Sequence, residues 1–268
     1  MRWLTRSELR FRPARGTALG NGARLVAGLV FFTLLCLLTS LAILAGGLVL
    51  PRLRRRRFTR AMICGMFRLH LGAMVRLGGL RLDLSALDAL KDAPALVIAP
   101  NHPSMIDAAL VLSRLPDVTC IMKPEILDNP LFGSGVRLAG YITNDPPRRM
   151  LRAAVESLGA GSHLLLFPEG TRSVRLPVNA LQRTVGVIAR RAGVPVQTVF
   201  IETGSAFLGK GWPLLRIPSM PVTYRLRLGR RFEAPADVDA FSRELEAYFR
   251  DELAGARLPA LPVHAGSR

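Results

Sequence analysis

The stretch from Leu25 to Leu50 limits the possible folds of this chain most strongly, because it contains no charged residue. It is longer than the roughly 20 residues that an α-helix needs to cross the hydrocarbon core of a bilayer. Its length, and the lack of an Ala-x-Ala cleavage site, argue against a removable signal peptide. The sequence therefore predicts a membrane-embedded segment over residues 25–50. Gly47 and Pro51 offer places to bend, so a re-entrant hairpin fits this segment as well as a crossing helix.

Positive charge is the strongest feature of the composition. The chain has 37 basic and 19 acidic residues, a net charge of +18. Such an excess suits either nucleic acid or an anionic membrane surface, and it would also suit a membrane scaffold that catalyses no reaction. Arginines stand on both sides of the apolar stretch, so the positive-inside rule does not decide its orientation. Because the sequence contains no nucleic-acid motif, we expect membrane lipids as partners and no nucleic acid.

The cysteines and histidines do not indicate a disulfide framework or a metal site. Cys36, Cys64 and Cys120 are odd in number and far apart, which predicts a reducing compartment. The four histidines are not spaced as metal ligands. We therefore expect no bound metal ion.

The flanks of the apolar stretch differ from the rest of the chain. Residues 1–24 are rich in Arg and Gly and predict a basic juxtamembrane arm. Residues 51–80 predict an interfacial helical linker, because Phe58–Leu77 places apolar residues near helical spacing with arginines between them. A helix packed on the catalytic core would show the same pattern. The tail, residues 255–268, is expected to be flexible.

Residues 81–254 alternate short apolar runs with helical patterns, which is typical of an α/β domain. Strands are expected at Ala95–Ala99, Val118–Met122, His163–Phe167, Val194–Ile201 and Val222–Leu228. Helices are expected at Ile106–Arg114, Pro147–Gly159, Val178–Ala192 and Ala236–Ala254.

The first candidate site is residues 101–107, Asn-His-Pro-Ser-Met-Ile-Asp, which follow an expected buried strand. On a continuous helix His102 and Asp107 would lie about 140° apart, so they could not meet. Pro103 and Ser104 allow a loop that turns into a helix, from whose first turn Asp107 can reach an imidazole nitrogen. A histidine held in this way can take a proton from an alcohol. A helix start with an incidental histidine fits the spacing equally well.

The second candidate site is residues 163–173, His-Leu-Leu-Leu-Phe-Pro-Glu-Gly-Thr-Arg-Ser, again an expected strand that ends in a loop. Arg172 has a permanent charge and a planar set of donors suited to phosphate. Gly170 lets the backbone approach an anion closely. The pattern predicts a phosphate-binding loop, and an ordinary turn with a surface ion pair is the alternative.

Taken together, the two sites carry a resemblance. Asn-His-x-x-x-x-Asp, followed later by Phe-Pro-Glu-Gly-Thr-Arg-Ser, is similar to the PlsC-type lysophospholipid acyltransferase family. Lys123, with residues 129–133 and 140–142, resembles that family's second block, and residues 193–196 resemble its fourth. The resemblance spans roughly residues 60–230.

The resemblance implies an α/β fold with a central mixed sheet and flanking helices, preceded by an N-terminal membrane-anchoring helical segment. It implies an acyltransferase that moves a fatty acyl group from acyl-CoA or acyl carrier protein to a lysophospholipid. The implied acceptor is 1-acyl-sn-glycerol 3-phosphate and the product phosphatidic acid, formed on the cytoplasmic face of the inner membrane without a cofactor. His102 is then the catalytic base, and Asp107 orients it. The implied acceptor-binding residues are Lys123, Glu169, Gly170, Thr171 and Arg172, with Arg172 on the phosphate.

Two departures from the family pattern leave the acceptor open. After the second site the family often shows an aromatic residue, a basic residue and Gly, where this chain has Leu-Gln-Arg-Thr at residues 181–184. The fourth block continues as Gln-Thr-Val-Phe at residues 197–200, where a second Pro is frequent. A lyso-aminolipid or a lipid-linked natural product is therefore the alternative acceptor.

Residues 204–210, Gly-Ser-Ala-Phe-Leu-Gly-Lys, match most of a nucleotide-binding P-loop. Gly211 stands where a Ser or Thr would hold magnesium, and Pro213 interrupts the helix that should cradle the phosphates. We therefore expect an ordinary loop here.

Overall fold

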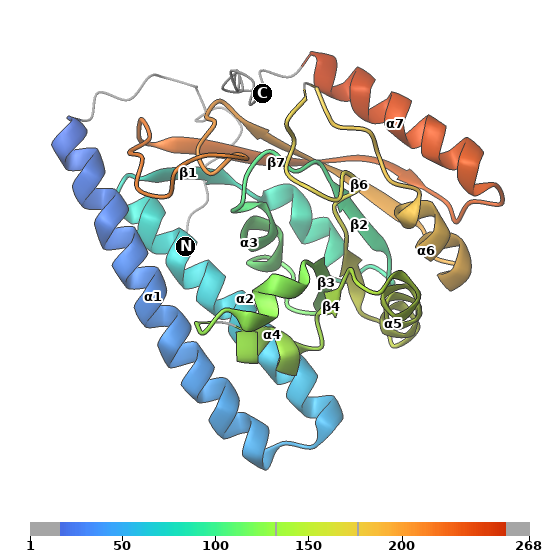
Figure 1. Cartoon of the computed structure of the whole chain (residues 1–268), viewed down its shortest axis with the longest axis horizontal. Coiled ribbons are helices and arrows are strands. Elements are labelled where there is room, and N and C mark those ends of the chain that lie inside the picture. The colour runs from blue at the N-terminus through green and yellow to red at the C-terminus, as the bar shows by residue number, and fades with distance from the viewer. Residues whose placement is uncertain (1–16, 132, 176, 256–268) are drawn as a thin grey trace, which may run out of the picture.

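The computed structural model describes residues 17–131, 133–175 and 177–255 (Figure 1). Most of the expected arm, and the tail from residue 256, lie outside the described residues. The helices are α1 (Ala18–Val49), α2 (Arg52–Arg76), η1 (Ser85–Leu90), α3 (Asp107–Leu112), η2 (Pro124–Asp128), α4 (Gly133–Ala139), α5 (Pro147–Gly159), α6 (Thr184–Ala192) and α7 (Val238–Ala254), where η marks a 3-10 helix. The strands are β1 (Leu80–Asp83), β2 (Val97–Pro100), β3 (Val118–Met122), β4 (Ile142–Thr143), β5 (His163–Leu165), β6 (Val196–Thr203) and β7 (Val222–Phe232).

The strands form one seven-stranded mixed sheet in the order β1-β7-β6-β2-β5-β3-β4, as the resemblance implied. β2 pairs in parallel with both β5 and β6, and β5 pairs in parallel with β3. β7 is antiparallel to β6, and β1 is parallel to β7. The carboxyl ends of β2, β3, β5 and β6 therefore meet at one edge of the sheet, which is where α/β proteins usually place their sites.

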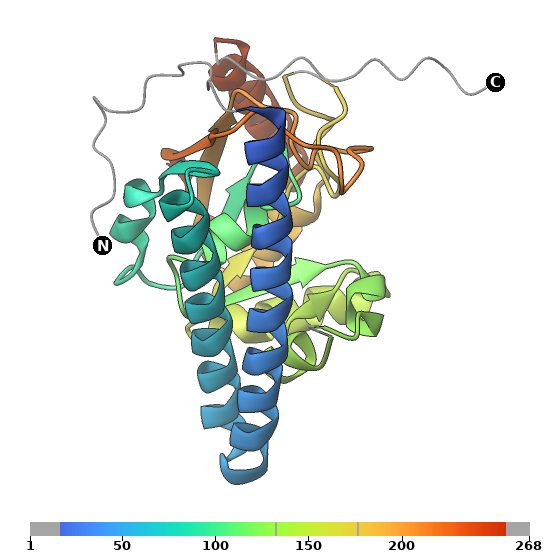
Figure 2. The ribbon, with the colours of Figure 1, turned by 90° about the vertical axis from the view of Figure 1, so that its left-hand side faces the viewer.

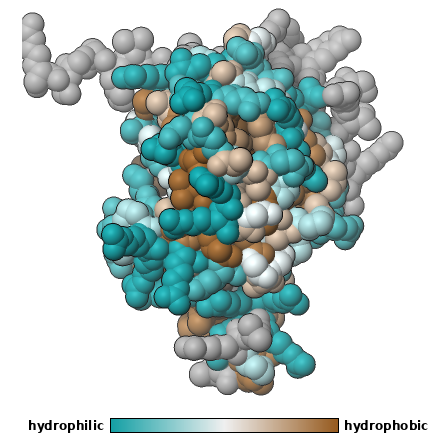
Figure 3. Space-filling view, turned by 90° about the vertical axis from the view of Figure 1, so that its right-hand side faces the viewer, coloured by the Kyte–Doolittle hydropathy of each residue, from teal (hydrophilic) through white to brown (hydrophobic). Residues whose placement is uncertain are grey.

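Alternate side chains of the central strands enter two different apolar cores. In β2, Ile98 belongs to the core that includes residues of α2, α3 and η1. Val97 and Ala99 belong to the core that includes residues of α5, α6 and α7. Both faces of the sheet are covered, which explains why these strands are apolar without interruption. Figure 3, seen from the side of α5 and α6, shows hydrophilic side chains surrounding a smaller apolar area.

α1 and α2 lie side by side as an antiparallel helical hairpin that turns at Leu50 and Pro51 (Figure 2). α1 begins at Ala18, inside the segment expected as an arm of residues 1–24, so that expectation is wrong for residues 18–24. Helix α1 runs through Gly46 without a break, and a Cβ there would lie 2.5 Å from the Phe58 ring of α2. Glycine therefore serves close packing of the two helices at this position.

The outer face of α1 is apolar and exposed. Ala18–Gly47 is long and apolar enough to cross a membrane. Its exposed large apolar side chains are Leu19, Val26, Val30, Leu34, Leu37, Leu38, Leu41 and Leu44. A large exposed apolar surface on one helix indicates association with a membrane.

Helix α2 is fixed to the α/β domain by a buried arginine. Arg60 is 6% exposed, and its Nη1 donates to Asp117 Oδ1 and to Ser162 Oγ, each at 2.7 Å. Its Nε donates to the carbonyl oxygen of Ala139 at 2.9 Å. A buried charge requires such partners, so α2 packs on the α/β domain. A helix packed on the core was the second of the two interpretations of Phe58–Leu77.

One expected helix is partly wrong. The pattern predicted a helix over Val178–Ala192, but α6 begins only at Thr184. The amide of Asn179 donates to Glu169 Oε2, and the amide of Leu181 donates to Glu246 Oε2, each at 2.9 Å. Because these bonds are made to carboxylates outside the segment, its first residues stay outside the helix.

Candidate active site

Asn101 fixes the point where the chain leaves strand β2. Its Nδ2 donates to the carbonyl oxygen of Ile201 at 3.1 Å, and its Oδ1 accepts from the amide of Ile201 at 2.7 Å. Pro100, the last residue of β2, has no N–H with which to continue the ladder to β6. The buried amide of Asn101 bonds to β6 in its place, and the next residue, His102, begins the loop.

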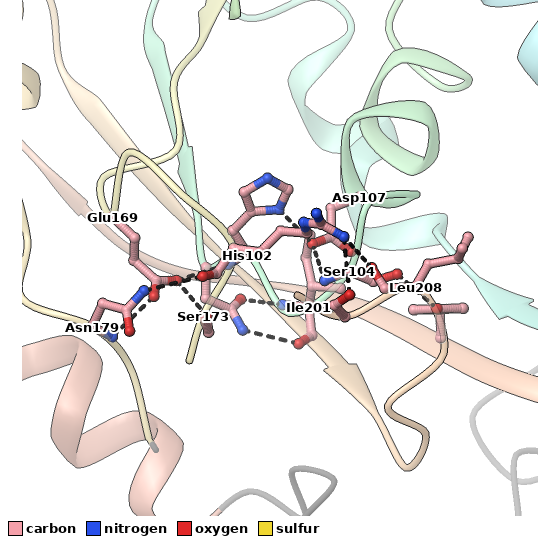
Figure 4. A network of polar contacts seen from close by, with 12 residues as sticks. His102, Ser104, Asp107, Glu169, Ser173, Asn179, Ile201 and Leu208 are labelled. Carbon is pink, nitrogen blue, oxygen red and sulfur yellow. Dashed lines mark hydrogen bonds and ion pairs between the residues drawn. The ribbon is translucent and has the colours of Figure 1, made fainter. Parts of the chain in front are cut away.

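His102 and Asp107 are in direct contact (Figure 4). His102 Nδ1 lies 2.8 Å from Asp107 Oδ2. Asp107 is the first residue of α3, and the same Oδ2 accepts from the amide of Ser104 at 2.7 Å. The loop-to-helix turn predicted for residues 101–107 is therefore formed, and it brings the two side chains together.

The carboxyl group of Asp107 is fully buried. Burial raises the pKa of Asp107, and the hydrogen bonds from His102 and Ser104 and the charge of Arg172 act against that rise. Asp107 Oδ1 has no hydrogen-bond partner among the described residues. A buried carboxylate with so few partners stabilises positive charge on the adjacent imidazole more strongly than a solvated one would.

The imidazole of His102 is held on its flat face as well. It stacks on the Phe167 ring at a centroid distance of 3.9 Å and an interplanar angle of 19°. The side chain is 18% exposed. Because Nδ1 is engaged by Asp107, Nε2 is the nitrogen that a substrate can reach; among the described residues it has no hydrogen-bond partner.

Glu169 holds the loop of His102 in place through hydrogen bonds. It is 4% exposed, and its Oε1 accepts from the amide of His102 at 2.9 Å and from Ser173 Oγ at 2.7 Å. Its Oε2 accepts from the amide of Asn179. Burial raises the pKa of Glu169, and these three hydrogen bonds act against the rise. Both oxygens are thus used by the chain itself, a geometry that favours a positioning role over the acceptor contact that the resemblance implied.

Arg172 points toward the same site from the loop after β5. Its Nη1 donates to the carbonyl oxygens of Leu208 and Gly209, at 3.0 and 2.9 Å. Arg172 shares the carbonyl oxygen of Leu208 with the amide of Met105, which places the guanidinium beside the turn between His102 and Asp107. In the described part of the chain, Nε and Nη2 have no hydrogen-bond partner. These donors can therefore bind an anion.

The remaining predicted site residues are Gly170, Thr171 and Lys123. Gly170 has a φ of +66°, and a Cβ there would lie 2.2 Å from Gln182 Nε2. Thr171 is partly exposed next to it. Lys123 is exposed at the carboxyl end of β3, which β5 separates from β2. Lys123 shares the edge of the sheet with His102, but no described contact joins the two.

The loop after β6 also contributes to the site, and the sequence did not predict this. Ser104 Oγ donates to the carbonyl oxygen of Phe207 at 2.9 Å, and the buried Tyr224 hydroxyl donates to Ser104 Oγ at 3.2 Å. The amide of Met105 donates to the carbonyl oxygen of Leu208 at 2.9 Å. The P-loop-like residues 204–210 therefore form an ordinary loop, as expected, but one that holds the His102 turn.

Comparisons with known proteins show which proteins the region around this site resembles. Residues 81–202, which include His102, Asp107 and Arg172, match a family model described as Acyltransferase. A 1-acyl-sn-glycerol-3-phosphate acyltransferase of Pseudomonas aeruginosa is 24% identical over 216 residues, which are 77% of this chain and 80% of that protein. One of Helicobacter pylori is 32% identical over 87 residues, 30% of this chain and 37% of that protein.

A solved structure shares the fold. The crystal structure of the 1-acyl-sn-glycerophosphate acyltransferase PlsC from Thermotoga maritima matches with a TM-score of 0.69 at 20% sequence identity. The match covers 87% of this chain and 96% of that one. The arrangement of sheet and helices is therefore the one found in that structure.

Proposed function

We propose that the chain belongs to the acyltransferase family whose model matches residues 81–202, and that it transfers a fatty acyl group from acyl-CoA or acyl carrier protein to the free hydroxyl of a lysophospholipid. The acceptor that we propose is 1-acyl-sn-glycerol 3-phosphate, and the product is phosphatidic acid. The names of the relatives support this choice. The observation that carries the proposal is the 2.8 Å contact of His102 Nδ1 with Asp107, which leaves Nε2 without a partner among the described residues, on a turn that Arg172 reaches through Leu208.

His102 is the general base in the proposed reaction. Its Nε2 takes the hydroxyl proton while the acceptor oxygen attacks the thioester carbonyl carbon. A carbon–oxygen bond forms, the carbon–sulfur bond breaks, and the departing thiolate takes the proton from the imidazolium. Asp107 keeps the proton of the neutral ring on Nδ1 and stabilises the imidazolium between the two steps. General-base catalysis of this kind contributes about 10²- to 10⁴-fold in rate.

Arg172 binds the acceptor phosphate in this proposal. Its Nε and Nη2 supply charge-assisted hydrogen bonds, and the contacts of Nη1 with Leu208 and Gly209 fix the plane of the guanidinium. The backbone at Gly170 and the hydroxyl of Thr171 lie next to it on the same loop. Lys123 is a further candidate for binding the phosphate, and it is exposed at the edge of the sheet.

We place the enzyme on the inner membrane with its catalytic domain on the cytoplasmic face. The apolar outer face of α1 supports membrane association. Acyl-CoA and acyl carrier protein are cytoplasmic thioesters, and the three cysteines are free and buried, which suits a reducing compartment.

The test is an assay of the purified full chain in detergent with acyl-CoA or acyl carrier protein as donor. We expect a diacyl product from 1-acyl-sn-glycerol 3-phosphate and no product with His102→Ala. Arg172→Ala should raise KM for the acceptor, whereas Arg152→Ala, which removes an arginine that is 85% exposed on α5, should change nothing. Unchanged turnover by His102→Ala would refute the mechanism.

A phosphate-free acceptor is the second candidate. Two observations favour testing it: carbonyl oxygens already occupy Nη1 of Arg172, and Gln182 packs over Gly170 where the family often has other residues. A lyso-aminolipid or a lipid-linked natural product would then be acylated by the same His102. Strong turnover of such an acceptor that is insensitive to Arg172→Ala would support this candidate over the first.

A further inference from the structure

The loop between β6 and β7, residues 204–221, exposes apolar side chains without a covering element. Leu214 is 51% exposed, Leu215 is 74% exposed and Ile217 is 47% exposed. Lys210 and Arg216 are exposed among them, and the loop contains no acidic residue. An exposed apolar cluster flanked by positive charge is typical of a surface that contacts lipid.

This loop lies beside the start of helix α1. The Cδ1 atom of Ile217 is 3.2 Å from the position that a Cβ would take on Gly22. Figures 1 and 2 both show the loop next to the N-terminal end of α1. The exposed side chains of the loop are therefore continuous with the apolar outer face of α1, although the two lie far apart in the sequence.

The base of the loop is joined to the candidate active site. Leu208 accepts hydrogen bonds at its carbonyl oxygen from Met105 and Arg172. Trp212 packs edge-on against Phe207 at a centroid distance of 6.0 Å. The guanidinium of Arg216 lies 4.6 Å over the Trp212 ring. These contacts connect the tip of the loop to the turn that carries His102.

We propose that residues 210–217 form a second membrane-contact element, which docks on the surface of an anionic phospholipid bilayer. The side chains of Leu214, Leu215 and Ile217 enter the boundary between headgroups and acyl chains. Lys210 and Arg216 meet the lipid phosphates. An anionic bilayer fits this surface better than a protein partner does, because the surface combines positive charge with continuity to the membrane-associated helix.

Two such contacts explain how a lipid could reach the site. If α1 were the only contact with the bilayer, the whole protein could still rotate about the axis of α1 relative to the membrane. The loop adds a second point next to Met105 and Arg172, so the site faces the bilayer. This inference goes beyond the proposed function, because it holds for any acceptor that resides in the membrane.

The test uses the single exposed thiol of Leu215→Cys. The native Cys36, Cys64 and Cys120 are buried, so an environment-sensitive fluorophore such as NBD should attach only to the new thiol. The labelled full chain is reconstituted in vesicles of phosphatidylcholine and phosphatidylglycerol. Arg152→Cys, at the exposed position on α5, is the matched control.

We expect a blue shift of the label at position 215 and a loss of its emission when the lipid acyl chains carry bromine. The control label should keep its aqueous emission and should be quenched by iodide. The inference is overturned if the label at 215 behaves like the control. It is also overturned by a blue shift without quenching by brominated lipid, which would place the label against protein. Leu214→Cys replaces Leu215→Cys if that variant does not fold, and neither readout requires turnover.

Discussion

Glu169 holds His102 by its main chain, with the carboxylate Oε1 2.9 Å from the His102 amide nitrogen. The carbonyl oxygen of His102 in turn accepts from the amide of Ser173 at 2.8 Å. The loops after β2 and β5 are therefore joined by two hydrogen bonds, one to the amide and one to the carbonyl group of His102. The position of the imidazole depends on a buried carboxylate that does not touch the ring.

We expect Glu169→Gln to lower both the unfolding free energy and kcat. A glutamine amide offers one acceptor oxygen and a donor NH2 group, so it cannot accept from Ser173 and from the amides of His102 and Asn179 together. An unsatisfied buried donor costs about 1–3 kcal/mol. Thermal unfolding and steady-state kinetics check this, with Glu156→Gln, an exposed glutamate on α5, as the control. A raised KM for the acceptor at unchanged kcat and stability would indicate direct acceptor binding by Glu169.

We expect Asp107→Asn to keep the fold and to lose most of kcat. An asparagine has the same size, and its oxygen in the place of Oδ2 can still accept from the amide of Ser104 and from Nδ1–H of His102, but a neutral amide does not stabilise an imidazolium as a carboxylate does. The expected loss is about 10²- to 10⁴-fold, as for the aspartate of serine-protease triads. Turnover measured at saturating acceptor, beside a circular-dichroism spectrum, separates this outcome from unfolding. Wild-type kcat in the variant would exclude the proposed pair.

The contact of His102 with Asp107 could be predicted from the sequence, because it is made within one loop and one helical turn. The support that surrounds it could not. Ser104 Oγ bonds to the carbonyl oxygen of Phe207, 103 positions away. Glu169 bonds to the amide of His102, 67 positions away. Such contacts follow from the order of the strands in the sheet, which no local pattern contains.

The same limit explains the mistaken start of the helix over Val178–Ala192. Residues 178–183 fit a helical pattern, yet two of their amides bond to Glu169 and Glu246. Tertiary hydrogen bonds outweighed the weak helical preference. The apolar stretch lies within one continuous helix, the first of the two alternatives that its sequence left open, whereas the start of that helix at Ala18 and its contact with α2 depend on packing.

We expect Gly170→Ala to destabilise the protein more than Gly193→Ala does. Both glycines have a left-handed φ, +66° and +65°, so both substitutions carry about 1–2 kcal/mol of backbone strain. A Cβ at Gly170 also meets Gln182 Nε2 at 2.2 Å, whereas nothing lies within 4 Å of a Cβ at Gly193. In a Gln182→Ala background the extra cost of Gly170→Ala should therefore decrease. Thermal unfolding of the single and double variants checks this, and equal costs in the wild-type background would contradict it.

His70 sits between the two helices of the hairpin. Its ring lies 6.3 Å from the Phe31 ring and 5.0 Å from the Phe32 ring of α1, and its Nδ1 is buried without a hydrogen-bond partner among the described residues. Burial lowers the pKa of His70 to about 4. The unfolded chain, with a histidine pKa near 6.5, therefore binds a proton that the folded chain excludes.

Stability should consequently be highest above about pH 6.5 and should fall as the pH drops toward about 4. The shift is equivalent to about 2 kcal/mol of unfolding free energy lost by pH 5. We expect His70→Phe to lack this part of the pH dependence, because phenylalanine fills the same space and binds no proton. Denaturant unfolding in detergent micelles at pH 7.5 and pH 5 measures the difference between the two proteins, in which the other titrating groups cancel. Equal losses in both would show that His70 is already protonated, or solvated, in the folded hairpin.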